Sequence, residues 1–217
     1  MKTIIVTCFQ RFGSYPANSS ELAARAMDGN LVSGYHVDIE MFPADIPRFD
    51  RAESVFEKAR RLMANGIICL GMDSGRKSLC IEYRTVNRLE NEKYCPPELN
   101  RTQIDLCEPY GHWFCLDLTA WKPHVFLQAC AMKGIPAEVT GDPGSFCCNH
   151  LMYQMDKSRS KHPWNWSIPW IFIHLPCSPE CVPEPSAAFY ETGKTTMPVA
   201  TMVRGIKLLL ETATLRD

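Results

Sequence analysis

The sequence has no long hydrophobic run and no excess of charge of one sign. No window approaches the roughly 20 apolar residues that a membrane-spanning helix needs, and one apolar run, residues 168–176, is interrupted by Pro169 and His174. The apolar start of the chain soon meets Gln10 and Arg11 and is too short for a signal peptide. Lys and Arg number 23 against 24 Asp and Glu, which leaves no basic surface for nucleic acid or an anionic membrane. We therefore expect a soluble, cytoplasmic protein that binds neither nucleic acid nor membrane.

The sequence also lacks the features of a small disulfide-stabilised protein. Eleven cysteines is a high but odd number, and 46% of the 217 residues are hydrophobic, enough to bury a core without disulfides. We therefore expect mostly reduced thiols and a single domain over residues 1–217. No metal or cofactor is expected, because the available cysteines and histidine have spacings that match no standard zinc finger (Cys147, Cys148, His150, Cys177 and Cys181).

Short apolar runs alternate with amphipathic stretches along the chain. Strands are predicted over residues 2–7, 35–42, 66–71, 137–140 and 170–174, and helices after Asn18 and over residues 52–64, 123–133, 148–157 and 199–212. Asn18 and Glu21 have the spacing of a capping box at the first helix. Residues 88–111, with two adjacent prolines and many charges, predict an excursion of loops or short hairpin strands. The alternation is typical of an α/β fold, an open twisted central sheet with helices on both faces.

Three reactive residues stand at the ends of predicted elements. Glu82 follows the strand at residues 66–71, Cys148 lies where a turn enters a helix, and His174 ends a strand. Functional groups of open α/β sheets collect at the carboxyl ends of strands and the amino ends of the following helices. A thiol, a base that takes its proton and a carboxylate that orients the base form the catalytic set of a cysteine hydrolase.

The position of Cys148 predicts an activated nucleophile. The free amides at a helix amino end stabilise a thiolate, and they can also hold the oxyanion that forms when the thiolate attacks a carbonyl. A cysteine between a turn and a helix can instead be a small buried hydrophobic residue. Position alone leaves both interpretations open.

Five segments resemble motifs of the pyroglutamyl peptidase type I family of cysteine peptidases, also called pyrrolidone-carboxylate peptidases. Residues 7–14, Thr-Cys-Phe-Gln-Arg-Phe-Gly-Ser, resemble Thr-Gly-Phe-x-Pro-Phe-Gly-Gly. Residues 71–76, Gly-Met-Asp-Ser-Gly-Arg, and 82–87, Glu-Tyr-Arg-Thr-Val-Asn, resemble Gly-x-x-Gly-Gly-Arg and Glu-Arg-x-x-x-Asn. Residues 143–153, Pro-Gly-Ser-Phe-Cys-Cys-Asn-His-Leu-Met-Tyr, resemble Ala-Gly-Thr-Phe-x-Cys-Asn-His-x-x-Tyr, and residues 172–176 match Phe-Ile-His-x-Pro. The segments follow the family's order and span most of the chain.

The resemblance implies a cysteine peptidase that removes an N-terminal pyroglutamyl (5-oxoprolyl) residue from peptides through an acyl-enzyme intermediate. Its partners would be peptides with a blocked N-terminus, and the family commonly forms homo-oligomers, so we expect a homodimer or homotetramer. The family's catalytic residues fall on Glu82, Cys148 and His174. The implied substrate-binding residues are Phe9, Phe12, Asn18, Gly71, Met72 and Phe146. Asn18 would serve equally well as a helix cap, and the three phenylalanines as core residues.

Several departures from the family pattern fall near the implied site. Cys8 and Ser14 replace glycines, Arg11 replaces a proline, Met72 stands where many members have glutamine, and Pro143 replaces alanine. They leave two alternatives open: a cysteine amidase of the same fold that acts on a different acyl group, and a catalytically silent binding protein on this scaffold. Retention of all three catalytic residues argues against the silent protein.

Overall fold

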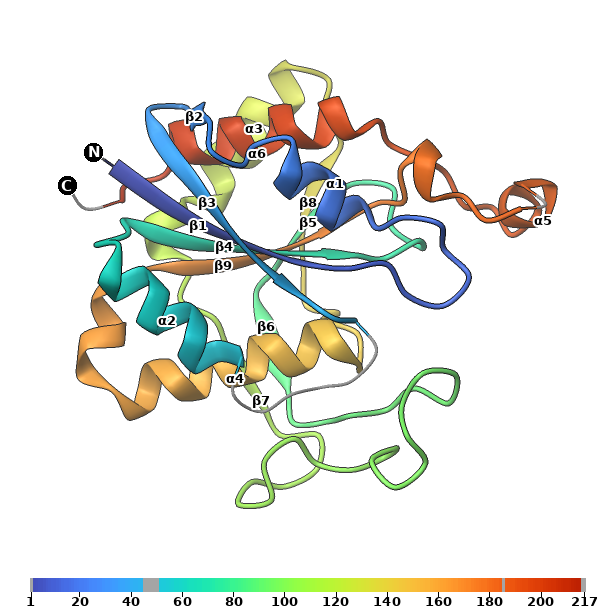
Figure 1. Ribbon diagram of the computed structural model, residues 1–217, viewed down its shortest axis with the longest axis horizontal. Helices are drawn as coiled ribbons and strands as arrows, with labels where there is room; N and C mark the ends of the chain where they lie inside the picture. The colour runs from blue at the N-terminus through green and yellow to red at the C-terminus, as the bar shows by residue number, and fades with distance from the viewer. Residues whose placement is uncertain (1, 45–50, 185, 216–217) are drawn as a thin grey trace.

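One seven-stranded sheet organises the computed structural model, which describes residues 2–44, 51–184 and 186–215. Its strand order is β2-β3-β1-β4-β9-β5-β8 (Figure 1). The bounds are β1 Lys2–Phe9, β2 Leu31–Val32, β3 Tyr35–Phe42, β4 Gly66–Met72, β5 Leu79–Glu82, β8 Ala137–Thr140 and β9 Trp170–Leu175. The four central strands β3, β1, β4 and β9 are parallel. Strand β5 is antiparallel to β9 and parallel to β8, and β2 is antiparallel to β3, so the sheet is mixed.

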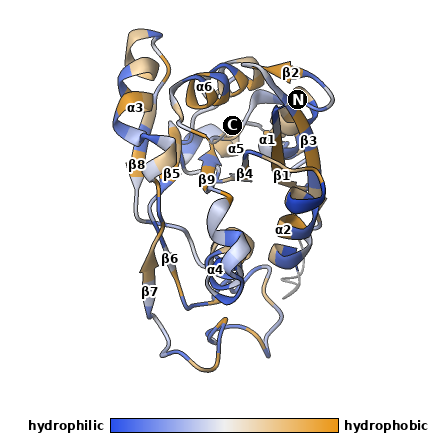
Figure 2. Ribbon diagram, turned by 90° about the vertical axis from the view of Figure 1, so that its left-hand side faces the viewer, coloured by the Kyte–Doolittle hydropathy of each residue, from blue (hydrophilic) through white to orange (hydrophobic). Residues whose placement is uncertain are grey.

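Helices cover both faces of this sheet, which confirms the predicted fold class (Figure 1). Helices α1 (Ser19–Arg25), α3 (Pro123–Met132) and α6 (Val199–Thr212) lie on one face, and α2 (Arg51–Arg61) and α4 (Cys147–Lys161) lie on the other. Each face has its own buried apolar cluster. Figure 2 shows hydrophobic colours along β1, whose residues after Lys2 are all buried, as expected of a strand covered on both sides.

Alternation along β9 decides which side chains reach the face of α4. Ile171 and Ile173 belong to the cluster beneath α1, α3 and α6, whereas Trp170 and Phe172 belong to the cluster beneath α2 and α4. Since successive side chains of a strand point to opposite faces, His174 shares the face of Trp170 and Phe172. The histidine is thereby directed toward α4.

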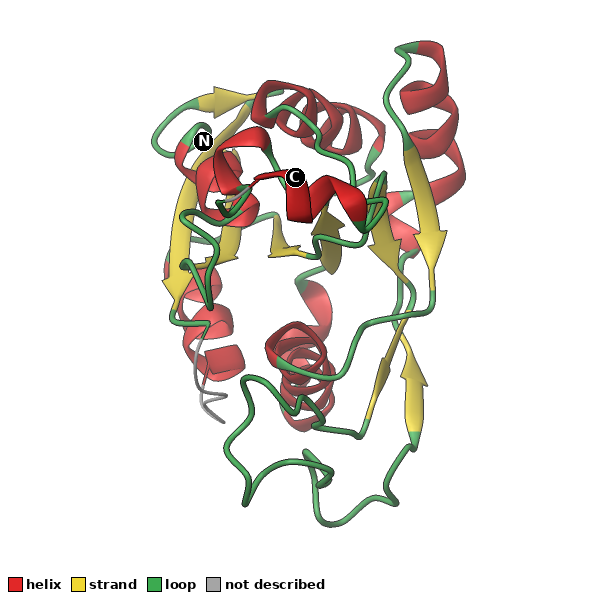
Figure 3. Ribbon diagram, turned by 90° about the vertical axis from the view of Figure 1, so that its right-hand side faces the viewer, coloured by secondary structure: helices red, strands yellow, loops and turns green. Residues whose placement is uncertain are grey.

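An excursion leaves the sheet after β5. Strands β6 (Arg84–Val86) and β7 (Trp113–Cys115) form an antiparallel pair, and the chain between them forms loops. Figure 3 shows these loops below the main sheet. A short helix α5 (Ser186–Glu191) and 3-10 turns η1 (Thr119–Trp121), η2 (Pro163–Ser167) and η3 (Pro179–Cys181) complete the described chain. In the part of the chain that the structure describes, we find no helix with the length and apolar character to cross a membrane.

Most predicted elements are confirmed, and the differences have local causes. The strands at residues 35–42 and 137–140 and the helix at residues 199–212 have the expected bounds. The capping box is wrong: Asn18 caps α1 by accepting from the amide of Ser20, but the Glu21 carboxylate pairs with Arg25, 2.9 Å away, rather than with the cap. The prediction missed β2, β5 and α5, which are too short for periodicity to reveal.

Candidate active site

A buried histidine and a buried glutamate meet where β9 lies beside β5. The His174 Nδ1 atom is 2.8 Å from Oε1 of Glu82, and the two side chains are 4% and 0% exposed. The antiparallel register sets Cys80 opposite His174, so the end of β5 lies alongside β9. An imidazole whose Nδ1 donates to a carboxylate keeps Nε2 as the acceptor that a general base needs.

Cys148 is the second residue of α4 and lines the same cavity as His174. Phe146 is the N-cap, and the first bond within the helix runs from the amide of His150 to the carbonyl of Phe146, at 2.9 Å. The first amides of a helix have no acceptor within it. Amides of this kind beside Cys148 suit an oxyanion.

The side chain of Asn149 anchors this end of α4 to the excursion. Its Oδ1 accepts from the amide of Val86 at 2.9 Å, and its Nδ2 donates to the carbonyls of Val86 and Arg88 at 2.7 and 2.8 Å. Because the residue after Cys148 is held by three backbone groups, the first turn of α4 is fixed in place.

Gly71 brings β4 close to the thiol. It pairs in register with His174, and a Cβ atom added to it would lie 2.7 Å from Sγ of Cys148 and 2.9 Å from the Phe172 ring. The absence of a side chain therefore lets the thiol lie against the strand next to the histidine. Gly71, expected among the binding residues, lies beneath the nucleophile.

The surroundings of Cys148 oppose the expected stabilised thiolate in the empty site. Burial raises the pKa of the Cys148 thiol well above its ordinary value, with further contributions from Cys147, Asp73 and Glu82, and its own backbone amide lowers it by less. The helix amides alone thus fail to outweigh desolvation. The thiol is protonated at neutral pH until a base receives its proton.

A cavity of about 470 Å³ opens in front of Cys148 and His174. Its walls include five residues expected to bind substrate: Phe9, Phe12, Asn18, Met72 and Phe146. Aromatic and polar residues that the sequence did not single out also line it, among them Tyr15, Asn91, Lys93 and Tyr94. Glu82 lies behind His174 rather than on the wall. The structure thus brings the expected residues together around one cavity.

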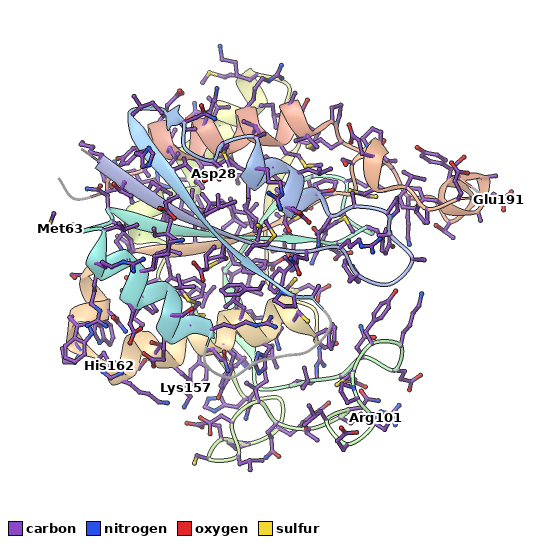
Figure 4. The ribbon with its side chains drawn as sticks, in the orientation of Figure 1. Asp28, Met63, Arg101, Lys157, His162 and Glu191 are labelled. Carbon is purple, nitrogen blue, oxygen red and sulfur yellow. The ribbon has the colours of Figure 1, made fainter. Side chains whose placement is uncertain are left out.

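Tyr94 extends the aromatic wall from the excursion between β6 and β7. Its ring centroid lies 5.6 Å from that of Phe12, edge to face, and 6.4 Å from that of Phe146. Its hydroxyl lies against Gly13. Figure 4 labels Arg101 on this excursion, and Figure 1 shows that the excursion lies on the same side of the sheet as α4. Nothing in the sequence of residues 88–111 identifies a pocket residue.

Asn18 borders the cavity but is also part of the scaffold. Its Oδ1 accepts from the amide and hydroxyl of Ser20 at 3.0 and 2.8 Å, and its Nδ2 donates to the carbonyl of Gln10 at 2.9 Å. An amide nitrogen carries two donor hydrogens, so a second one is available to a ligand. The role of Asn18 as a helix cap is confirmed, and its role in binding stays a prediction.

The departures from the family pattern lie at different distances from the cavity. Met72 and Pro143 line it. Cys8 packs in the cluster on the opposite face of the sheet, and Arg11 is exposed. Only part of the divergence therefore bears on the bound group.

Two residues that sequence reasoning did not assign hold the Glu82 carboxylate. Arg76 Nη2 lies 3.3 Å from Oε1 of Glu82, and the Thr140 hydroxyl donates to Oε2 at 3.3 Å. The sequence signal that could have identified Arg76 was its place at the end of the motif over residues 71–76. Among the described residues no group of His, Cys, Asp or Glu is arranged to hold a metal.

Comparison with known proteins places the chain in a family. The family model described as pyroglutamyl peptidase matches residues 2–216. Pyrrolidone-carboxylate peptidases of Bacillus mycoides (strain KBAB4) and Bacillus cereus (strain Q1) are 28% and 29% identical over 217 and 218 residues, and in both cases the match covers 99% of this chain and 94% of the relative.

Solved structures share the fold at lower identity. Pyroglutamyl peptidase I of Bacillus amyloliquefaciens has a TM-score of 0.79 at 22% identity, covering 99% of this chain and 97% of that one. Pyrrolidone carboxyl peptidase of Thermococcus litoralis has a TM-score of 0.78 at 19% identity, covering 98% and 93%. The resemblance seen in the motifs is confirmed, and the chain belongs to the pyroglutamyl peptidase family.

Proposed function

We propose that this chain is a cysteine peptidase that removes an N-terminal pyroglutamyl residue from peptides, with Cys148, His174 and Glu82 as its catalytic residues. One observation carries the proposal. In a chain whose family model covers residues 2–216, His174 shares a cavity with a cysteine at a helix amino end, and the Glu82 carboxylate lies 2.8 Å behind the histidine. This is the arrangement that acyl transfer through a thiol requires.

The reaction follows from the positions of these groups. His174 takes the proton of Cys148 as Sγ attacks the carbonyl that joins the pyroglutamyl group to the peptide. The amides of the first turn of α4 hold the oxyanion, and His174 gives its proton to the departing amine. Water, deprotonated by His174, then releases pyroglutamate from the thioester. Glu82 holds the imidazole in the required tautomer throughout.

The resting pKa of Cys148 agrees with proton transfer during attack rather than before it. Burial raises the pKa of the thiol, so the thiol gives its proton to His174 only as Sγ attacks the carbonyl of a bound substrate. The neutral thiol is the stable form of the empty site.

The cavity suits a small, flat, uncharged ring. Phe9, Phe12, Phe146 and Tyr94 supply apolar walls, and the second Nδ2 hydrogen of Asn18 is a candidate donor for the lactam carbonyl. Apolar walls alone discriminate small changes by only about 1–3 kcal/mol. A polar partner for the lactam is therefore needed to reject proline, which lacks that carbonyl and carries a charged amine.

Release of a fluorophore from a pyroglutamyl amide by the purified protein tests the proposal. We expect turnover that is lost in Cys148→Ser, and little or no turnover of the matching prolyl amide. If the purified, folded protein hydrolyses no pyroglutamyl amide, the proposed substrate is wrong.

A second candidate, a cysteine amidase for a different acyl group, is favoured by one observation. Met72 and Pro143, two departures from the family pattern, stand on the cavity wall. In that case Cys148 is alkylated by iodoacetamide in a His174-dependent manner while pyroglutamyl amides are not turned over. A panel of acyl amides would then identify the group.

We further propose a cytoplasmic location and assembly into a homodimer or homotetramer. All eleven cysteines are free thiols, eight of them buried, which suits a reducing compartment. Trp164 and Trp166 are 50% and 57% exposed and offer apolar surface for a second copy. Light scattering on the purified protein measures the oligomeric state, and a monomer at micromolar concentration would contradict the proposed assembly.

A further inference from the structure

Arg76 connects the catalytic carboxylate to the segment that leads to the nucleophile. It lies in the loop between β4 and β5, with a side chain 16% exposed. Its Nη2 reaches Oε1 of Glu82 and also donates to the backbone carbonyl of Asp142. Its Nε lies 3.1 Å from the Asp73 carboxylate. A forked, planar cation can satisfy several acceptors at once, which a lysine cannot.

The oxygen that Arg76 contacts is the one that orients the base. Oε1 of Glu82 accepts from both His174 Nδ1 at 2.8 Å and Arg76 Nη2 at 3.3 Å, while Oε2 accepts from the Thr140 hydroxyl at 3.3 Å. With both oxygens engaged, the plane of the carboxylate is fixed. The direction in which His174 points is thereby fixed as well.

The other end of the contact lies in the turn before the nucleophile. Asp142 stands six positions before Cys148, and its amide donates to the Thr140 hydroxyl at 3.0 Å. Arg76 and Thr140 therefore both bridge Glu82 to this turn. Burial lowers the pKa of the Arg76 guanidinium, but Glu82, Cys80 and Asp73 raise it by more than burial lowers it. The pKa therefore lies above its ordinary value, and the cation stays charged.

We propose that Arg76 is a positioning residue that acts through Glu82, aligning the carboxylate that orients His174 with the turn that presents Cys148. The inference rests on the proposed function for the reaction that Arg76 supports. The choice of Arg76 itself rests on the geometry. It predicts that Arg76 affects the chemical step rather than substrate binding, and only while Glu82 is present.

Arg84 provides a matched control. Its Nε donates to the carbonyl of Gly141, the residue next to Asp142, and no ion pair joins it to Glu82 in the described chain. Arg84→Met removes an arginine contact to the same turn without touching the carboxylate. The comparison separates support of the turn from alignment of Glu82.

The test measures kcat and KM for a fluorogenic pyroglutamyl amide in Arg76→Met, Arg76→Lys, Arg84→Met, Glu82→Gln and the Arg76→Met/Glu82→Gln double variant. For Arg76→Met we expect kcat to fall about 10- to 100-fold, the factor that one hydrogen bond to a charged group is worth, with KM within about twofold. Arg76→Lys should recover part of the loss, and Arg84→Met should stay within about threefold. The double variant should match Glu82→Gln alone within about twofold.

Three results would overturn the inference: wild-type kcat in Arg76→Met, an equal loss in Arg84→Met, or a double variant whose loss is the product of the two single losses. Thermal melting checks each fold. If Arg76→Met does not fold, Arg76→Lys must lower kcat without lowering the melting temperature, and unchanged kcat there overturns the inference.

A second readout keeps this inference separate from the proposed substrate. The rate at which iodoacetamide alkylates Cys148, followed by peptide mapping, depends on the triad and not on the acyl group. If the wild type turns over no pyroglutamyl amide, the proposed function fails, and the alkylation rate alone decides on Arg76. A rate about tenfold lower in Arg76→Met supports the positioning role, and an equal rate overturns it.

Discussion

The two halves of the site are built in different ways. On the catalytic side, Glu82, His174 and Arg76 are joined by charged hydrogen bonds of 2.8 and 3.3 Å, and the first two stand on strands of the central sheet. On the substrate side, Phe12 and Tyr94 stand on loops and meet ring to ring, with centroids 5.6 Å apart.

This difference separates the chemistry from the choice of substrate. Directional bonds on rigid strands hold the reacting atoms in one geometry, and small displacements there act on the rate of the chemical step. Aromatic contacts between loops tolerate change and adapt to a different ligand. Changes on the catalytic side should therefore act on kcat, and changes on the substrate side on KM.

The largest expected effect comes from the nucleophile. Cys148→Ser should lower kcat by about a millionfold, because the nucleophile of a triad can carry that much of the rate. The neighbouring Cys147→Ser is the control, since Cys147 is buried and its thiol donates to the carbonyl of Ala44 at 3.0 Å, a bond that serine can keep. Turnover of a pyroglutamyl amide measures both. If the two variants behave the other way round, Cys147 is the nucleophile.

Loss of the base and loss of the carboxylate should lower kcat by different amounts. His174→Ala should be nearly as damaging as loss of the thiol, because the imidazole moves the proton in both steps. Glu82→Gln should lower kcat by up to about ten-thousandfold and leave measurable activity, since Glu82 orients the imidazole without exchanging protons. Single-turnover kinetics would measure the residual rate. Full activity in Glu82→Gln would leave a catalytic pair in place of a triad.

Gly71→Ala tests whether β4 sets the position of the thiol. The added Cβ would lie 2.7 Å from Sγ of Cys148 and 2.9 Å from Phe172, so one of the two must move. We expect kcat to fall about a hundredfold, the effect of a displacement of about 1 Å, with a loss of about 1–3 kcal/mol in the free energy of unfolding. Urea titration measures the latter. Gly75→Ala is the control, because its Cβ would meet only the Asp73 carboxylate, 3.3 Å away.

The protonation state of the thiol can be read from its reactivity. Because burial raises the pKa of Cys148, the reactive thiolate is scarce at neutral pH. We expect the rate of its alkylation by iodoacetamide to rise about tenfold per pH unit from pH 7 to pH 9, as for any acid below its pKa. Peptide mapping distinguishes Cys148 from the exposed Cys107 and Cys115. A rate that is constant over this range would show a thiolate already paired with an imidazolium.

The smallest expected effect lies on the substrate side. Tyr94→Ala removes ring contacts with Phe12 and Phe146, which should raise KM about threefold to tenfold with little change in kcat. Tyr110 is an exposed tyrosine of the same excursion whose hydroxyl lies 3.3 Å from the Glu90 carboxylate, and Tyr110→Ala should leave both constants unchanged. A fall in kcat with unchanged KM in Tyr94→Ala would contradict the division between the two sides.

The sequence predicted what depends on local patterns. The strand at residues 35–42 and the helix at residues 199–212 have long periodic stretches, and both have the expected bounds. Glu82, Cys148 and His174 were proposed because each lies in a recognisable motif, and Cys148 and His174 also lie near the ends of predicted elements. Candidate catalytic residues near the ends of strands and helices can therefore be proposed without a structure.

The rest depends on pairing between distant segments. Strand β5 has four residues, too few for a period, and its antiparallel place beside β9 cannot be read from the chain. Arg76 meets Glu82 because of that placement. Tyr94 reaches the cavity from a region without regular pattern. The raised pKa of Cys148 needs the extent of burial, which a position in a helix does not give.

The strand order also constrains how the protein is made. Strand β9 is inserted between β4 and β5, although it is the last of the seven to leave the ribosome. Until residues 170–175 have emerged, the edges of β4 and β5 that face β9 have no strand to pair with, and unpaired edges promote aggregation. Insertion of this strand completes the sheet and delivers the histidine to its carboxylate in the same event. We therefore expect a nascent or truncated chain that ends before Trp170 to have no hydrolytic activity, and the protein to acquire its reactivity only when its sheet is closed.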